Sequence, residues 1–381
     1  LYVKDLTTNS KTAKFENYGL YTQVEQINKT YLRNHGLDEN GQLYKAEMFE
    51  FTRDPDEIKL TSDTGYDKVA FEKRLEIKGS DDHTKLIKML DDLNNLSMPI
   101  EEVFPKYFDE ENYFTWLAFQ MITGNTDTSS QNFYLYSPQN GNKWYFIPWD
   151  NDGAWQFGEN LLFDGVKGYN FKFGVSNYWG SMLHQRVLKS AEYRKKLDDK
   201  VNEMRSILTK DKLKTLVSGY SAITRKYLYA MPDKMYATQT EKEFDQILET
   251  IPKEIDSNYE MYLTSLRRPC PFYLAVPEYL GDKMLFQWDA SYDFSGEDIT
   301  YSFELSRDYK MQTVIKKQEN LAIPQMLVPK LPPGQYFYRV NARNKSGETQ
   351  TAMEIYEAAD DQKYFGTLSF YVMPDGSIQG A

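Results

Sequence analysis

The pattern of apolar and polar positions predicts a mixed α+β region that begins with extended structure. Residues 18–24 are rich in β-branched and aromatic side chains and predict a strand, and residues 25–34 predict a helix that stops near Gly36. Residues 54–82 are polar and charged and predict an exposed excursion. Apolar residues at helical spacing predict a further helix over 85–96.

The middle of the chain predicts a buried helix followed by a loop and a hairpin. Residues 110–123 leave almost no polar face, so this helix is expected to be buried on all sides. A polar loop over 126–131 follows, and then two strands at 132–136 and 143–147 joined by a turn with Asn140-Gly141. The second strand leads directly into an acidic segment, Asp150-Asn151-Asp152.

The periodicity changes from helical to alternating near Pro269 and Pro271. Residues 178–266 carry apolar stripes and charged faces, which predict several helices. Beyond the two prolines the alternation is typical of strands, at 283–288, 299–305 and 336–342. We therefore expect an α+β domain over 1–266 and an all-β domain over 269–381.

Composition narrows the classes of function. The 381 residues are 41% hydrophobic and 27% charged, which suits a packed core. The net charge of −11 disfavours nucleic acid and anionic membrane surfaces as partners. No run of roughly 18 apolar residues occurs, so no membrane span is expected. Cys270 is the one cysteine and the three histidines are scattered, which excludes an intrachain disulfide and argues against a zinc site.

The strongest candidate chemistry lies between Asp127 and Asp150. Asp127 and Asn132 stand five positions apart in the polar loop. A hairpin returns to its starting point, so Asp150 is expected beside Asn132 in space. Phosphoryl transfer needs one carboxylate to orient the attacking hydroxyl, and an amide oxygen with a second carboxylate to hold Mg²⁺. The alternative is that Asp and Asn stand here only because they favour turns.

These motifs resemble the CotH kinase family. The resemblance rests on residues 125–136 and 144–153, above all Pro148-Trp149-Asp150-Asn151-Asp152, and on the upstream stretches at 18–26 and 41–45. It implies an atypical protein-kinase fold over 1–266 in a secreted bacterial protein. Such a kinase, at the cell surface or on a spore coat, transfers the ATP γ-phosphate to Ser or Thr of a partner protein with Mg²⁺ or Mn²⁺. The upstream part of the family's domain is expected to be missing.

The resemblance also implies a role for each matching residue. Asp127 becomes the catalytic base, Asn132 and Asp150 the metal ligands, and Asp152 a second candidate ligand. Glu25 and Lys45 become nucleotide-binding residues. The alternatives are that Glu25 is only a helix-start carboxylate and Lys45 an ordinary surface lysine.

Two departures from kinase patterns keep other functions open. No basic residue precedes Asp127, so control through a phosphorylated activation loop is not expected, and no glycine-rich phosphate loop is present. A non-catalytic cell-surface scaffold or adhesion protein with a kinase-like fold is the rival hypothesis. A carbohydrate-binding wall protein is a third possibility, because aromatic residues make up 15% of the chain.

The all-β region resembles a fibronectin type III domain, an immunoglobulin-like sandwich. Tyr336 in Leu331-Pro332-Pro333-Gly334-Gln335-Tyr336 resembles that family's corner tyrosine, and Trp288 its core tryptophan. The resemblance implies a module that spaces or presents its neighbour. Some other β-sandwich is the alternative.

Overall fold

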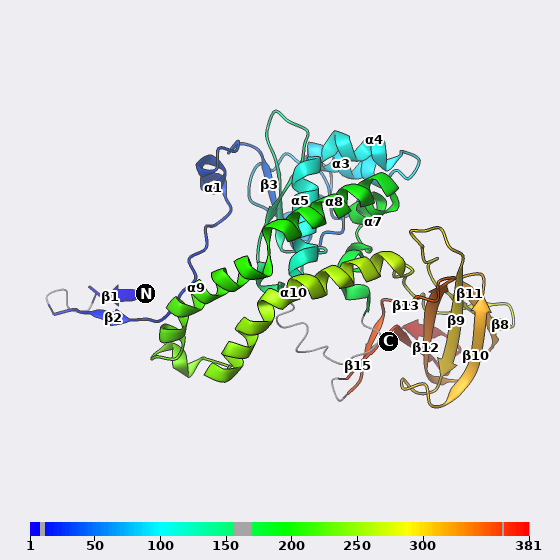
Figure 1. Cartoon of the computed structure of the whole chain (residues 1–381). Helices are drawn as coiled ribbons and strands as arrows, with labels where there is room; N and C mark the ends of the chain where they lie inside the picture. The colour runs from blue at the N-terminus through cyan, green and yellow to red at the C-terminus, as the bar shows by residue number, and fades with distance from the viewer. Residues whose placement is uncertain (8–11, 156–169, 360–361, 381) are drawn as a thin grey trace.

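The computed structural model of the chain describes residues 1–7, 12–155, 170–359 and 362–380 (Figure 1). Helices predominate up to Arg267 and strands follow from Glu278 onward. This mixed α+β content confirms the fold class at the level of secondary structure. Within the described part, no helix is long and apolar enough to cross a membrane.

A four-stranded antiparallel sheet lies at the centre of the helical region, in the order β4-β3-β5-β6. Its strands are β3 (Gln42–Ala46), β4 (Leu75–Ile77), β5 (Phe133–Ser137) and β6 (Tyr145–Pro148). The β5–β6 pair is the predicted hairpin, with Phe133 opposite Pro148. Asn112 covers the outer edge of β6. Its side chain accepts from Phe146 N and donates to Phe146 O, so these two backbone groups are not available to another strand.

Helices cover one face of this sheet. They are α3 (Thr84–Asn94), α4 (Ile100–Tyr107), α5 (Glu110–Thr123), α7 (Met182–Lys189) and α8 (Ala191–Ile207). The predicted buried helix is α5, which starts at the N-cap Asp109 and ends at Gly124, where φ is +64°. Its rings pack on side chains from β5 and β6, as Trp116 does on Phe146 at 4.5 Å between centroids.

The remaining helices confirm the prediction for residues 178–266. α9 (Lys210–Leu228) and α10 (Glu241–Arg267) lie side by side and extend away from the sheet (Figure 1). The η3 turn (Gly174–Tyr178) packs against α10. A small hairpin of β1 (Tyr2–Lys4) and β2 (Phe15–Asn17) lies near the joint between α9 and α10, where Leu20 N donates to Asp233.

Two expectations for the first 82 residues are wrong. Residues 18–24 form no strand, because Tyr21 and Val24 face solvent and no neighbouring strand pairs with them. The helix begins later than predicted: it is α1 (Lys29–Asn34), capped by the Asn28 side chain.

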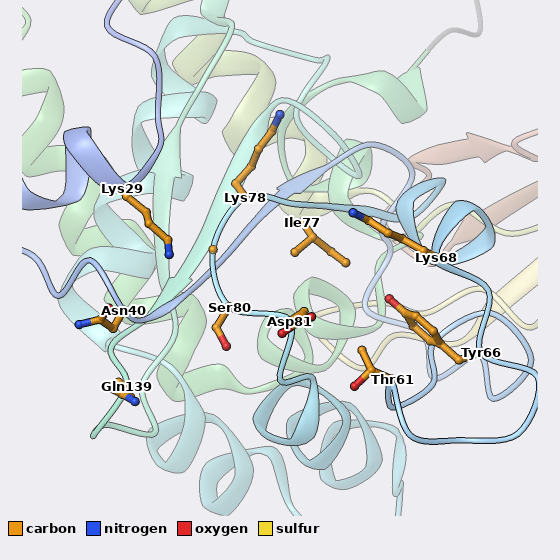
Figure 2. A pocket seen from close by; sticks show the side chains of 11 residues that line it. Lys29, Asn40, Thr61, Tyr66, Lys68, Ile77, Lys78, Ser80, Asp81 and Gln139 are labelled. Atoms are coloured by element: carbon orange, nitrogen blue, oxygen red, sulfur yellow. The ribbon is translucent and has the colours of Figure 1, made fainter.

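The predicted excursion over 54–82 is instead partly structured. It contains α2 (Lys68–Glu72) and β4, each fixed by one fully buried residue, Phe71 and Leu75. Elements of five and three residues are too short to show a clear periodicity, which explains the error. The chain after β4 forms one wall of a cavity of about 660 Å³, lined by Lys29, Lys68 and Lys78 among others (Figure 2).

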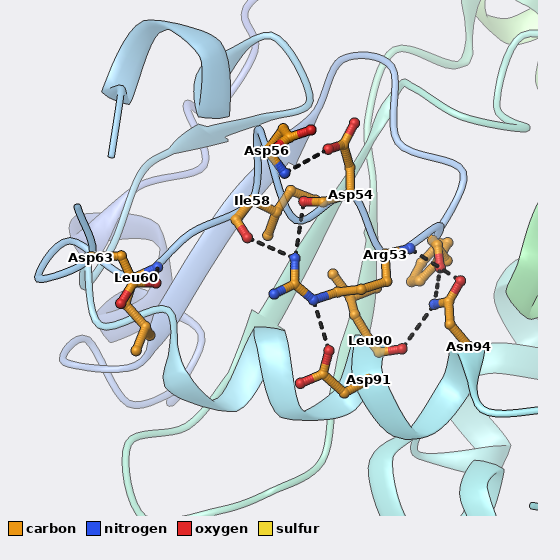
Figure 3. Close-up of polar contacts among 10 residues, drawn as sticks. Arg53, Asp54, Asp56, Ile58, Leu60, Asp63, Leu90, Asp91 and Asn94 are labelled. Carbon is orange, nitrogen blue, oxygen red and sulfur yellow. Dashed lines mark hydrogen bonds and ion pairs between the residues drawn. The ribbon is translucent and has the colours of Figure 1, made fainter. Parts of the chain in front are cut away.

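Hydrogen bonds and an ion pair connect the start of the 54–82 segment to α3 (Figure 3). Arg53 donates to Asp91 at 2.7 Å and to the carbonyls of Asp54 and Ile58 at 2.9 and 2.8 Å. Asn94 donates to Phe51 O and accepts from Arg53 N. The backbone bend that these contacts secure includes Phe51, whose φ is +58°.

The C-terminal strands form two antiparallel sheets. The larger has the order β10 (Val314–Leu321), β9 (Ile299–Ser306), β12 (Gly334–Asn344), β16 (Thr367–Val372) and β17 (Ile378–Gly380), with β13 (Thr349–Thr351) also on β12. The smaller has the order β11 (Gln325–Pro329), β8 (Lys283–Gln287) and β7 (Glu278–Leu280). A separate hairpin joins β14 (Ile355–Glu357) to β15 (Lys363–Phe365).

Both sheets contribute to one core, so the arrangement is a two-layer sandwich. Trp288 is buried in it and stacks on Phe303 at 6.2 Å. The Tyr336 hydroxyl donates to Pro332 O at 2.7 Å, which is the backbone contact expected of a corner tyrosine.

Candidate functional site

The loop after α5 holds Asp127 in a fixed orientation. The Asn125 side chain accepts from Asp127 N at 3.1 Å, which turns the chain directly after the helix. The Asp127 carboxylate accepts from Gln131 Nε2 at 2.6 Å and from Asn132 Nδ2 at 2.7 Å. The two residues whose spacing suggested a site are therefore in direct contact.

The hairpin brings the acidic segment back to this loop, as the sequence predicts. Asp150 follows β6 by two residues, and Asn125 Nδ2 donates to Asn151 Oδ1 at 3.3 Å. A Cβ placed on Gly153 would lie 3.2 Å from the Asp127 Cβ and 2.9 Å from Asn125 Oδ1. This close approach explains why glycine stands at that position.

Four of the predicted site residues share one electrostatic environment. Partial burial raises the pKa of Asp150, and the neighbouring carboxylates of Asp152 and Asp127 raise it further. Lys45 acts in the opposite direction and favours the charged form of Asp150. Three carboxylates thus lie near a single lysine, and this excess of negative charge favours the binding of a cation beside Asp150.

Lys45 lies on the sheet face opposite α5, together with an aromatic pair. It stands beside Tyr134 in the β3–β5 register and pairs with Glu47 at 2.6 Å. The rings of Tyr134 and Trp149 meet at 5.6 Å in an edge-to-face arrangement. Trp149 immediately precedes Asp150, so this aromatic surface borders the acidic segment. Both rings lie within the sequence motif, but the motif assigns them no role.

Glu25 lies apart from this group. It sits on the exposed segment before α1, where its carboxylate pairs with His35 at 2.9 Å. That hydrogen bond lowers the pKa of Glu25. Across the described ranges no hydrogen bond or ion pair joins Glu25 to Lys45, so its nucleotide-binding role stays a prediction without a supporting contact.

The donor set fits a hard divalent cation with bound phosphates. Asn132 uses its Nδ2 on Asp127, which leaves its Oδ1 as an oxygen donor, and Asp150 supplies a carboxylate. Within the described part of the chain, no group of three or more His, Cys, Asp or Glu side chains could hold a metal by itself. Mg²⁺ is commonly held by one or two protein oxygens together with water and substrate phosphates, so two donors are sufficient.

The 660 Å³ cavity is not part of this site (Figure 2). Its lining includes Asn40, before the start of β3, and Gly79, after the end of β4. Lys45 lies toward the other end of β3, beside Asp150. The lining residues given for this cavity include none of Asp127, Asn132 and Asp150.

Comparisons with known proteins agree with the motif at the site. The family model described as CotH kinase protein matches residues 1–262. No curated protein matches the chain. Among solved structures, surface layer protein SbsC, domains 1–6, is similar at 10% identity and a TM-score of 0.14, over 71% of this chain and 38% of that one. The chain thus spans well under half of that protein, and the likeness is too low to support an argument.

Proposed function

Because the chain belongs to the CotH kinase family, we propose that it is a protein kinase that transfers the ATP γ-phosphate to Ser or Thr of a partner protein. The observation that carries the proposal is the convergence of Asp127, Asn132 and Asp150 from two ends of one hairpin. We further propose that it works outside the cell, at the cell surface or on a spore coat. Its fibronectin type III-like sandwich would space or present the kinase domain.

Asp127 is the proposed base. Its two carboxylate oxygens accept hydrogen bonds from Gln131 and Asn132, which fix the carboxylate in one orientation. A fixed, charged carboxylate can orient a substrate hydroxyl and accept its proton as the new O–P bond forms.

Asn132 Oδ1 and the Asp150 carboxylate are the proposed ligands of Mg²⁺ or Mn²⁺, with Asp152 beside them. When bound, the metal would neutralise phosphate charge. Lys45 reduces the negative charge around Asp150 and can pair with a phosphate oxygen. The partly exposed ring of Trp149, which the buried Tyr134 supports in an edge-to-face arrangement, offers an apolar side chain next to these groups that suits the adenine ring.

Asp127→Asn tests the assignment of the base. Asn keeps the size and one acceptor oxygen, so Asn132 and Asp150 should still hold the metal. We expect ATP affinity within a few-fold of the parent and a loss of phosphate transfer of about 10²-fold or more. Transfer of labelled γ-phosphate to a general acceptor, or to the protein itself, measures the loss.

Asp211→Asn provides a matched control, since Asp211 is an exposed residue in the first turn of α9. It should leave transfer unchanged. Equal activity in Asp127→Asn and in the parent would disprove the role of Asp127. A parent that transfers no phosphate with any metal would instead support a non-catalytic scaffold.

One surface feature is consistent with that scaffold, which is the second candidate. Leu216, Tyr220 and Ile223 form an exposed apolar stripe along α9, at 42%, 68% and 59% exposure. Such a stripe is typical of a surface that binds another protein. It is equally compatible with a kinase that recruits a partner, so the transfer assay decides between the two.

A further inference from the structure

A small cavity with both polar and apolar lining residues lies behind the loop that carries Asp127. Its volume is about 20 Å³, and its lining includes Gln120 from α5, Asn125 and Thr126 from the loop, and Asn177 from η3. A cavity needs about 10–15 Å³ to hold one water molecule. The space is therefore large enough for a single water.

Two side chains that line this cavity lack hydrogen-bond partners among the described residues. Both amide atoms of Gln120 are unpaired, and so is the Thr126 hydroxyl. Gln120 is 1% exposed and Thr126 is 8% exposed, so bulk solvent does not satisfy them. Buried polar groups without partners are rare and costly, and a buried water is their usual partner.

We propose that one ordered water occupies this cavity and connects Gln120 to Thr126. Its two hydrogens and two lone pairs can satisfy an amide N–H, an amide oxygen and a hydroxyl. A metal cation is disfavoured, because the described lining residues include Lys172 and no carboxylate. The apolar alternative, an empty cavity, would leave three polar atoms unpaired.

The water would act as a positioning element for the loop. Other contacts already hold the loop from the same side: Asn177 donates to Thr126 O at 3.0 Å, and the Tyr178 hydroxyl donates to Asn125 O at 3.3 Å. Thr126 immediately precedes Asp127, so a link from α5 through water to Thr126 would limit how far the carboxylate can shift. This role in catalysis rests on the proposed function, whereas the presence of the water does not.

A high-resolution crystal structure of the parent gives the direct test. We expect one electron-density peak within hydrogen-bond distance of Gln120 and Thr126, and no peak in Gln120→Met. An empty cavity in the parent would overturn the proposal.

The melting temperature of Gln120→Met gives a second test, because the direction of its change depends on whether the cavity holds a water. If the water is present, the variant removes its partners and should lower the melting temperature by about 2–4 °C. If the cavity is dry, removal of two unpaired polar atoms should raise the melting temperature, which would contradict the proposal. Gln246→Met, the same change at an exposed position of α10, is the control and should shift it by less than about 1 °C.

Kinetics test the positioning role separately. In Gln120→Met we expect kcat for phosphate transfer to fall by about ten-fold with KM for ATP unchanged. Density for the water with an unchanged kcat would overturn the positioning role alone. If the parent transfers no phosphate, the proposed function and this role fail together, while the crystallographic and thermal tests still decide whether the water is present.

Discussion

Replacing Glu354 by Gln should change how the stability of the sandwich depends on pH. Burial raises the pKa of Glu354 from 4.5 to about 7, and the charge of Asp289 adds to the effect. One carboxylate oxygen accepts from Leu274 N at 2.7 Å, but the other is buried without a partner. The protonated acid is therefore the form that the folded chain prefers, and Gln resembles that form in size and charge.

The expected change in unfolding free energy follows from the difference between the pKa of Glu354 in the unfolded chain and its pKa in the folded chain. At about 1.4 kcal/mol for each pKa unit, a change from 4.5 to about 7 corresponds to about 3 kcal/mol. Since the folded-state pKa is the higher one, this stability is fully present below pH 4.5 and is lost as the pH rises through about 7. The amide introduced by Glu354→Gln cannot ionise, so the variant should match the parent in acid and exceed it by about 3 kcal/mol in mild alkali.

Urea denaturation of both chains over this pH range measures the effect. Every other titratable group is common to the two chains, so the difference in unfolding free energy isolates Glu354. Hydrogen exchange of amides in β8 and β12 would show that the sandwich is the part stabilised. A difference that does not vary between acid and alkali would refute the argument that burial controls this carboxylate.

Two further predictions concern the candidate site and the sandwich core. If the chain binds Mg-ATP as we propose, saturation at a hundred times Kd would stabilise the parent by about 2.7 kcal/mol, and Asp150→Asn should abolish this effect. Without ligand the variant should be no less stable at neutral pH, because burial and the neighbouring carboxylates disfavour the charged form of Asp150. Equal thermal shifts with Mg-ATP in variant and parent would show that Asp150 is not a ligand. Tyr336→Phe should cost about 1 kcal/mol by loss of the 2.7 Å bond to Pro332 O, whereas an unchanged urea midpoint would show that this contact contributes nothing.

Local pairing explains which parts of the fold could be predicted from the sequence. The β5–β6 hairpin and α5 depend on neighbours in sequence, and both were predicted correctly together with the meeting of Asp127, Asn132 and Asp150. β4 pairs with β3 across about 30 residues and has only three residues of its own, so no local pattern marks it. Residues 18–24 have strand-forming side chains but no strand beside them, and propensity alone does not create a strand.

The spatial proximity of the candidate site residues was predictable to a similar extent and for similar reasons. Residues joined by one hairpin could be placed together from their spacing. Lys45 could be linked to Asp150 only through the family resemblance, because its strand pairs with β5 from far away in sequence. The small cavity behind Thr126 had no signal in the sequence, since it depends on how η3 and α10 pack against the end of α5.

The backbone at the two ends of the hairpin bears on the proposed metal site. Asn132 and Asp150 both have left-handed backbones, with φ of +59° and +49°. Asn and Asp tolerate this conformation better than other residues with a side chain, so a turn alone would accept both of them. The proposed function adds a requirement that a turn does not have. It needs an amide oxygen at one end of the hairpin and a carboxylate at the other to hold one metal, and glycine, which fits the same backbone, supplies neither.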